Sequence, residues 1–128
     1  MLRRSLLITL LLAPACAWAQ DELVQMGKVA TLAPLCGLRA EGWAFDLRRA
    51  ELQQATGSRR FDDEALRAAP GRGQVEAALG YAESEALEDF AGSKPLEACG
   101  RLLSSPDLDR ADEVVNAFRA QRRPAPGS

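Results

Sequence analysis

Apolar residues recur at three- and four-residue spacing along most of this 128-residue chain, and no stretch of useful length alternates apolar with polar residues. Such spacing gathers apolar side chains on one face of an α-helix, whereas a half-buried β-strand needs alternation. Glycine and proline interrupt the pattern at intervals that suit ordinary helices and short loops. The chain is therefore predicted to be an all-α bundle of about five to six short helices.

Helix start and stop signals divide the chain into six predicted helices. Pro34 and Gly37 end the first helix, Gly57 ends the second, and Pro95 and Ser105 start the last two. A Pro/Gly-rich turn is expected at residues 69–73. The predicted helices are Asp21–Leu35, Glu41–Ala55, Ser58–Arg67, Gln74–Phe90, one from Pro95, and one from Ser105 to about Gln121.

The apolar spacing also predicts which side of each helix is buried. These positions are Leu23, Met26, Val29, Ala30 and Ala33 in the first helix; Trp43, Leu47, Ala50 and Gln54 in the second; Val75, Ala78, Leu79, Ala82, Ala86 and Phe90 in the fourth; Leu96, Cys99, Leu102 and Leu103 in the fifth; and Leu108, Ala111, Val114, Val115 and Phe118 in the sixth. The interior is thus expected to consist mainly of Leu, Val and Ala.

Residues 1–19 have the three parts of a secretory signal peptide. Arg3 and Arg4 are the basic start, Leu6–Ala13 is the apolar run, and Ala17-Trp18-Ala19 is an A-x-A cleavage site. The apolar run is shorter than the roughly 20 residues of a transmembrane helix. We expect cleavage near Ala19 and export to the periplasm or the medium, with lipidation at Cys16 as the alternative.

Export would leave a single helical domain at residues 20–121 and a disordered tail at residues 122–128. The 14 remaining basic and 18 acidic residues give a net charge of −4, because the leader holds two of the 16 basic residues. Binding to a phosphate backbone requires clustered cations, whereas the basic residues here are scattered. We expect no nucleic-acid partner and no transmembrane segment.

Cleavage would also leave two cysteines, Cys36 and Cys99, in an oxidising compartment. An even pair in that setting predicts a disulfide, with a free or intermolecular thiol as the alternative. On the chain-entropy model, closing a loop of about 64 residues stabilises the fold by roughly 4 kcal/mol. Trp43 is predicted to be a core residue that covers this disulfide rather than a ligand platform.

The chain contains no histidine, which excludes a Ser-His-Asp triad, a Cys–His pair and every zinc site that uses histidine. Glu85 and Asp89, one helical turn apart, could bind a hard cation or act as acid and base, although a solvated helix face also explains them. The acids Asp107, Asp109, Asp112 and Glu113 fit the dipole at the start of the last helix. No catalytic residue, metal or cofactor is predicted.

Several short motifs resemble an uncharacterised family of small secreted alphaproteobacterial proteins, which are helical domains of unknown function. The motifs are L-x-x-L-C-G at Leu32–Gly37, then Trp43, then Gly80-Tyr81 before the partner cysteine at Cys99. The similarity covers roughly residues 22–118, and the interval from Tyr81 to Cys99 is longer here. The resemblance implies a periplasmic helical protein with one disulfide and no activity to transfer. Trp43 and Tyr81 are candidates for interaction or core positions.

Together these features favour a non-enzymatic periplasmic protein that binds another protein or an envelope component through a helical face. A periplasmic stress or acid chaperone is the alternative, because a chain rich in carboxylates loses negative charge as the pH falls. A small hydrolase that uses Glu85 and Asp89 is the third hypothesis.

Overall fold

The computed structural model describes residues 21–57, 71–92 and 95–122. Within these ranges the chain forms five helices and no strand, which confirms the all-α prediction. The helices are residues 21–35, α2 (Glu41–Thr56), α4 (Arg72–Gly92), α5 (Pro95–Ser104) and α6 (Asp107–Arg122). The predicted leader with Cys16, the helix Ser58–Arg67 and residues 123–128 of the predicted tail lie outside the described residues. Arg122, which was assigned to a disordered tail, is the last residue of α6.

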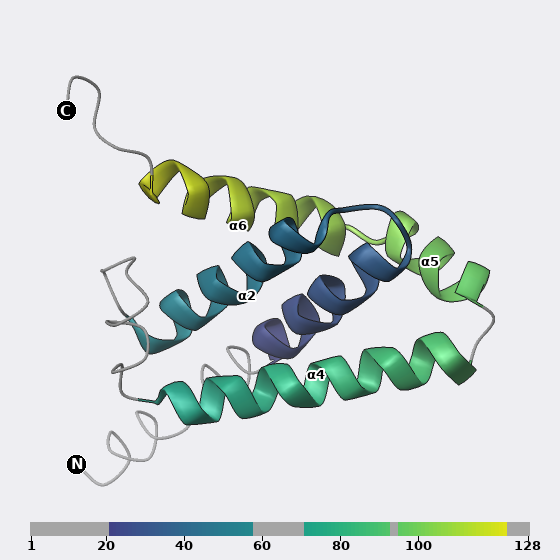
Figure 1. Ribbon diagram of the computed structural model, residues 1–128, viewed down its shortest axis with the longest axis horizontal. Coiled ribbons are helices and arrows are strands. Elements are labelled where there is room, and N and C mark those ends of the chain that lie inside the picture. The colour runs from purple at the N-terminus through teal and green to yellow at the C-terminus, as the bar shows by residue number, and fades with distance from the viewer. Residues whose placement is uncertain (1–20, 58–70, 93–94, 123–128) are drawn as a thin grey trace, which may run out of the picture.

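The helices pack around the 21–35 helix. In Figure 1 this helix, in purple, lies between α2 and α4; α6 packs along α2, and α5 connects α4 to α6 at one end. Its predicted buried face is confirmed at Leu23, Met26, Val29, Ala30 and Ala33. Leu47, Ala86, Leu102 and Val115 from the other four helices join the same core. None of the helices that the structure describes is long and apolar enough to cross a membrane.

Glycine allows a close approach between the 21–35 helix and α4. A Cβ atom added to Gly27 would lie 2.7 Å from the Cβ of Ala82, closer than such atoms approach each other. Any side chain at this position would therefore force the two helices apart. Small residues on both helices are what allow the bundle to close here.

The first two helices end where the sequence predicts. Gly37 adopts a positive φ of 70°. Its N–H donates a hydrogen bond to the carbonyl of Pro34, and the N–H of Leu38 donates one to the carbonyl of Ala33. This pattern is the left-handed glycine cap of a helix C-terminus. Gly57 has a φ of 69° and caps α2 in the same manner.

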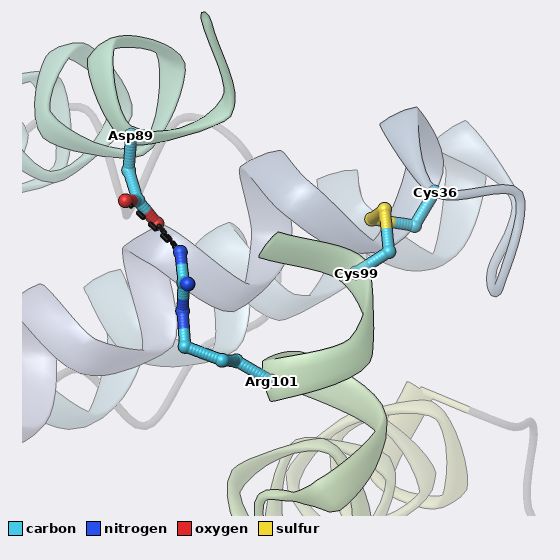
Figure 2. The surroundings of a disulfide bond; sticks show 4 residues. All are labelled: Cys36, Asp89, Cys99 and Arg101. Atoms are coloured by element: carbon cyan, nitrogen blue, oxygen red, sulfur yellow. Dashed lines mark hydrogen bonds and ion pairs between the residues drawn. A yellow bond between two sulfur atoms is a disulfide. The ribbon is translucent and has the colours of Figure 1, made fainter. Parts of the chain in front are cut away.

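A disulfide joins the end of the 21–35 helix to α5. The Cα atoms of Cys36 and Cys99 are 5.6 Å apart, and the sulfurs are bonded, as Figure 2 shows. The bond links residues 63 positions apart in the sequence. It therefore closes a loop that contains α2 and α4, and the predicted pairing is confirmed.

The predicted buried face of α5 is wrong at two positions. Ala98 and Leu102 are buried, but Leu96 and Leu103 are 87% and 62% exposed. Ala98 and Leu102 are four residues apart and share one side, whereas Leu96 and Leu103 are seven apart and share another. Because α5 packs against α4 and α6 near the end of the bundle, none of the helices in the described part of the chain covers its second side.

Two smaller predictions also need correction. Gln54, assigned to the buried face of α2, is exposed in the last turn of that helix, where its amide can bind water. The turn predicted at residues 69–73 is too long, because Arg72 and Gly73 already belong to α4. Gly71 has a φ of 79°, and its carbonyl accepts the N–H of Val75, so the helix starts directly after this glycine.

Candidate functional site

A groove lies between α2 and α4, and its first part has a volume of about 320 Å³. Its walls alternate apolar and charged side chains from the two helices. They are Phe45, Arg48, Arg49 and Leu52 of α2, and Glu76, Leu79, Gly80 and Glu83 of α4. This hollow brings together parts of the chain that are about 30 residues apart in the sequence.

A second hollow of about 410 Å³ continues the first toward the other end of α4. The two share Arg48 and Glu83, so they form one elongated depression, which we call the α2–α4 groove. In this second part the 21–35 helix contributes to the lining together with α2 and α4. Its lining residues are Ala30, Thr31, Pro34, Leu35, Glu41, Arg48, Glu83 and Leu87.

Helical periodicity explains why these residues form two facing walls. Apart from Arg49 and Gly80, successive lining positions on each of the two helices are three or four residues apart, so each set forms one stripe along its helix. These positions are Glu41, Phe45, Arg48 and Leu52 on α2, and Glu76, Leu79, Glu83 and Leu87 on α4. Each stripe borders the side of its helix that packs into the core.

Three large apolar side chains of the groove are exposed. Phe45 is 57% exposed, Leu35 is 47% exposed and Leu87 is 45% exposed, and they come from three different helices. Leu79 is half-buried between them and the core. An apolar surface to which several helices contribute, bordered by charged residues, is typical of a protein interaction site.

In the first part of the groove the two walls carry opposite charges. Arg48 and Arg49 lie on α2, whereas Glu76 and Glu83 lie on α4. Arg49 stacks over Phe45 with its guanidinium carbon 5.3 Å from the ring centre. This part of the groove therefore has a basic wall, an acidic wall and apolar side chains between them, whereas Glu41 adds an acid to the α2 wall in the second part.

Arg48 on the basic wall is also hydrogen-bonded to the 21–35 helix. Arg48 donates to the Thr31 hydroxyl at 3.4 Å, and that hydroxyl in turn donates to the Gly27 carbonyl at 3.0 Å. Across the groove, Glu76 pairs with Arg72 one turn earlier at 2.8 Å. These contacts orient the side chains of Arg48 and Glu76 at the rim of the groove, because each is bonded to another residue of the bundle.

Trp43 is in the core and connects α2 to α6. It is 7% exposed, and its indole N–H donates a hydrogen bond to the Asp112 carboxylate at 3.0 Å. Arg39 donates to both carboxylate oxygens of Asp112, at 2.9 and 2.6 Å. The hydrogen bond from Arg39 lowers the pKa of Asp112, despite the opposite effect of partial burial. The predicted cover of Trp43 over the disulfide stays a prediction.

Tyr81 and Glu85 interact with each other on the outer side of α4. Tyr81 is 58% exposed, and its hydrogen bond to Glu85 raises the pKa of the phenol. The negative charge of Glu85 acts in the same direction. Tyr81 is therefore on the surface, although its neighbour Gly80 lines the groove.

Asp89 points away from α4 toward α5. Its carboxylate accepts two hydrogen bonds from Arg101, at 2.9 and 3.1 Å, as Figure 2 shows beside the disulfide. Glu85 and Asp89 thus have different partners, a tyrosine on the same helix and an arginine on the next. Their positions fit a structural use of both acids, and no group of three or more metal-binding side chains occurs within the described ranges.

One buried acid, Glu51, and one half-buried acid, Asp112, were not identified from the sequence. Glu51 is 4% exposed, and burial raises its pKa from 4.5 to about 7, an effect that Glu22 increases and Arg110 reduces. Asp112 was attributed only to the dipole of α6. The signal was present in both cases, since Glu51 follows Leu47 by four positions and Asp112 follows Leu108 by four, so each acid extends a buried stripe.

Comparison of the chain with protein-family models, with curated proteins and with solved structures found no match.

Proposed function

We propose that this protein is a non-enzymatic periplasmic protein that binds another protein through the α2–α4 groove. The observation that supports this proposal is the exposure of Phe45, Leu35 and Leu87 from three helices around one elongated hollow. Burying these side chains against a partner would remove apolar surface from water, which is the main driving force of protein association.

Export is part of the same proposal. It is supported by the signal-like segment at residues 1–19 and by the disulfide, because disulfides persist in oxidising compartments. The basic and acidic walls would add orientation and partner selection to the apolar contact.

A photo-crosslinking amino acid in place of Phe45 tests this proposal in periplasmic extract. We expect it to capture a specific protein, and Phe45→Glu and Leu87→Glu in the unlabelled protein should each abolish competition for that capture. Leu96→Glu is the matched control, because Leu96 is an exposed leucine on α5, outside the groove. Circular dichroism would verify that all variants fold. Unlabelled Phe45→Glu protein that competes for the capture as strongly as the Leu96→Glu protein would contradict the proposal.

A further inference from the structure

We infer that the partner segment bound by the α2–α4 groove is an amphipathic α-helix of about three turns with one acidic and one basic flank. This inference rests on the proposed function and specifies the chemistry of the partner. Its basis is the length of the groove, the nature of its walls and the arrangement of its charges.

The length of the groove matches a short helix. The lining positions run from Glu41 to Leu52 on α2 and from Glu76 to Leu87 on α4, so the last position follows the first by eleven residues on each helix. At about 1.5 Å per residue each wall is about 16 Å long, which corresponds to about three helical turns. A hollow that extends along two helices suits an elongated partner better than a compact small molecule.

The walls favour a helix over an extended peptide. An extended peptide gains much of its affinity by pairing its backbone with an open strand edge. Here both walls are α-helices, whose backbone groups bond within the helix, so the groove offers side chains alone. A partner helix satisfies its own backbone and places residues at i, i+3, i+4 and i+7 on one face, which suits contact with Phe45, Leu79 and Leu87.

The charges define the two flanks of the partner. Acidic residues on one flank would face Arg48 and Arg49 on α2, and basic residues on the other flank would face Glu76 and Glu83 on α4. A helix with acids on both flanks would gain at one wall and be repelled at the other, as would a helix with bases on both flanks. The groove should therefore select a helix whose flanks differ in charge.

Three designed peptides test this inference with the full exported chain. Each has the same leucine stripe on an alanine-rich helix; one has Glu on one flank and Lys on the other, one has Glu on both, and one has Lys on both. We expect the mixed peptide to bind about tenfold more tightly than either uniform peptide in fluorescence anisotropy, and to gain helicity on binding.

Charge reversal in the protein gives a second measurement. Arg48→Glu and Glu83→Arg should each weaken binding of the mixed peptide about fivefold. A variant in which all four charges are reversed, with Arg48→Glu, Arg49→Glu, Glu76→Arg and Glu83→Arg, should restore binding, because this part of the groove again has one wall of each sign and the peptide can bind in the opposite direction. Glu113→Arg is the control, since Glu113 is exposed on α6 and does not line the groove.

Equal affinity for the three peptides, no binding of the mixed peptide at about 1 mM, or failure of the fourfold charge-reversal variant to restore binding would overturn the inference. If a periplasmic protein is still captured at Phe45 while the peptides fail in this way, the helical partner is wrong and the proposed function stands. If capture also does not depend on Phe45, the proposed function is wrong as well.

Discussion

Replacing Glu51 by glutamine should stabilise the protein at neutral and alkaline pH but not at acidic pH. Glu51 lies on α2 and is 4% exposed, near Glu22 and Arg110. Burial disfavours its charged form and raises its pKa from 4.5 to about 7. Glutamine has the shape of the protonated acid without the charge, so it should remove the cost of ionisation.

The sign and size of the effect follow from this shift. The folded protein holds the proton more tightly than the unfolded chain, so the stability that Glu51 contributes is complete below pH 4.5 and is lost as the pH rises through about 7. At about 1.36 kcal/mol per pH unit, the shift corresponds to roughly 3 kcal/mol at pH 8 and above. This is a large fraction of the roughly 5–15 kcal/mol that stabilises a typical domain.

Urea denaturation followed by circular dichroism at several pH values measures the difference. We expect Glu51→Gln to be more stable than the unmodified protein by about 3 kcal/mol at pH 8, with the difference disappearing below about pH 4.5. Glu113→Gln, an exposed substitution on α6, should show no such trend. A stability difference that is the same at pH 4.5 and pH 8 would refute the assignment of a buried, titrating Glu51.

The same experiment bears on the acid-chaperone hypothesis. A chaperone activated by acid must loosen as the pH falls. Protonation of Glu51 acts in the opposite direction and tightens the fold between pH 7 and pH 4.5. Loosening would therefore have to begin below this range, where carboxylates such as Asp112 lose their charge-dependent bonds.

Three further mutagenesis experiments probe the bundle. Replacing Cys36 and Cys99 by alanine should cost about 4 kcal/mol, because the bond closes a loop of 63 positions; a loss below about 1 kcal/mol in urea denaturation would contradict the chain-entropy argument. Gly27→Ala should destabilise the protein by about 1–3 kcal/mol because the added methyl group pushes α4 away, whereas Gly100→Ala, which has open space around it, should stabilise the protein by up to about 1 kcal/mol. Equal shifts of the melting temperature in the two variants would contradict this account of the contact at Gly27. Asp112→Ala should lower the free energy of unfolding by about 1–3 kcal/mol at pH 7, because it removes the bonds from Arg39 and Trp43. The pKa of Asp112 is lowered in the fold, so this loss should shrink as the pH falls below 3.8, and a loss that stays constant with pH in urea titrations would contradict the ion-pair account.

Much of the fold could be predicted because its signals are local. Gly37 and Gly57 end their helices through a backbone conformation that glycine adopts readily, and this preference belongs to the residue itself. The buried face of the 21–35 helix follows from spacing along a single helix. The disulfide followed from parity, since Cys36 and Cys99 are the two cysteines that remain after the predicted leader.

The candidate site could be predicted much less well. Phe45 and Leu87 belong to separate helices, and the apolar spacing along α2 or along α4 does not indicate that both residues line the α2–α4 groove. Leu96 and Leu103 also show that burial cannot be predicted from residue type alone. Their apolar character predicted burial, but the position of α5 leaves them exposed. Whether a helix side is covered depends on how many neighbours surround it.

The sequence by itself determined the helical class, the glycine-capped ends of the first two helices and the pairing of Cys36 with Cys99, because these depend on backbone preference, periodicity and residue counts. Only the tertiary structure decided which acids are buried, which leucines face water and where a groove remains between helices. The physical reason is that burial is a property of the packed assembly. Glu51 and Glu113 are the same residue type on two helices of similar length, and packing alone places one in the interior and the other in solvent.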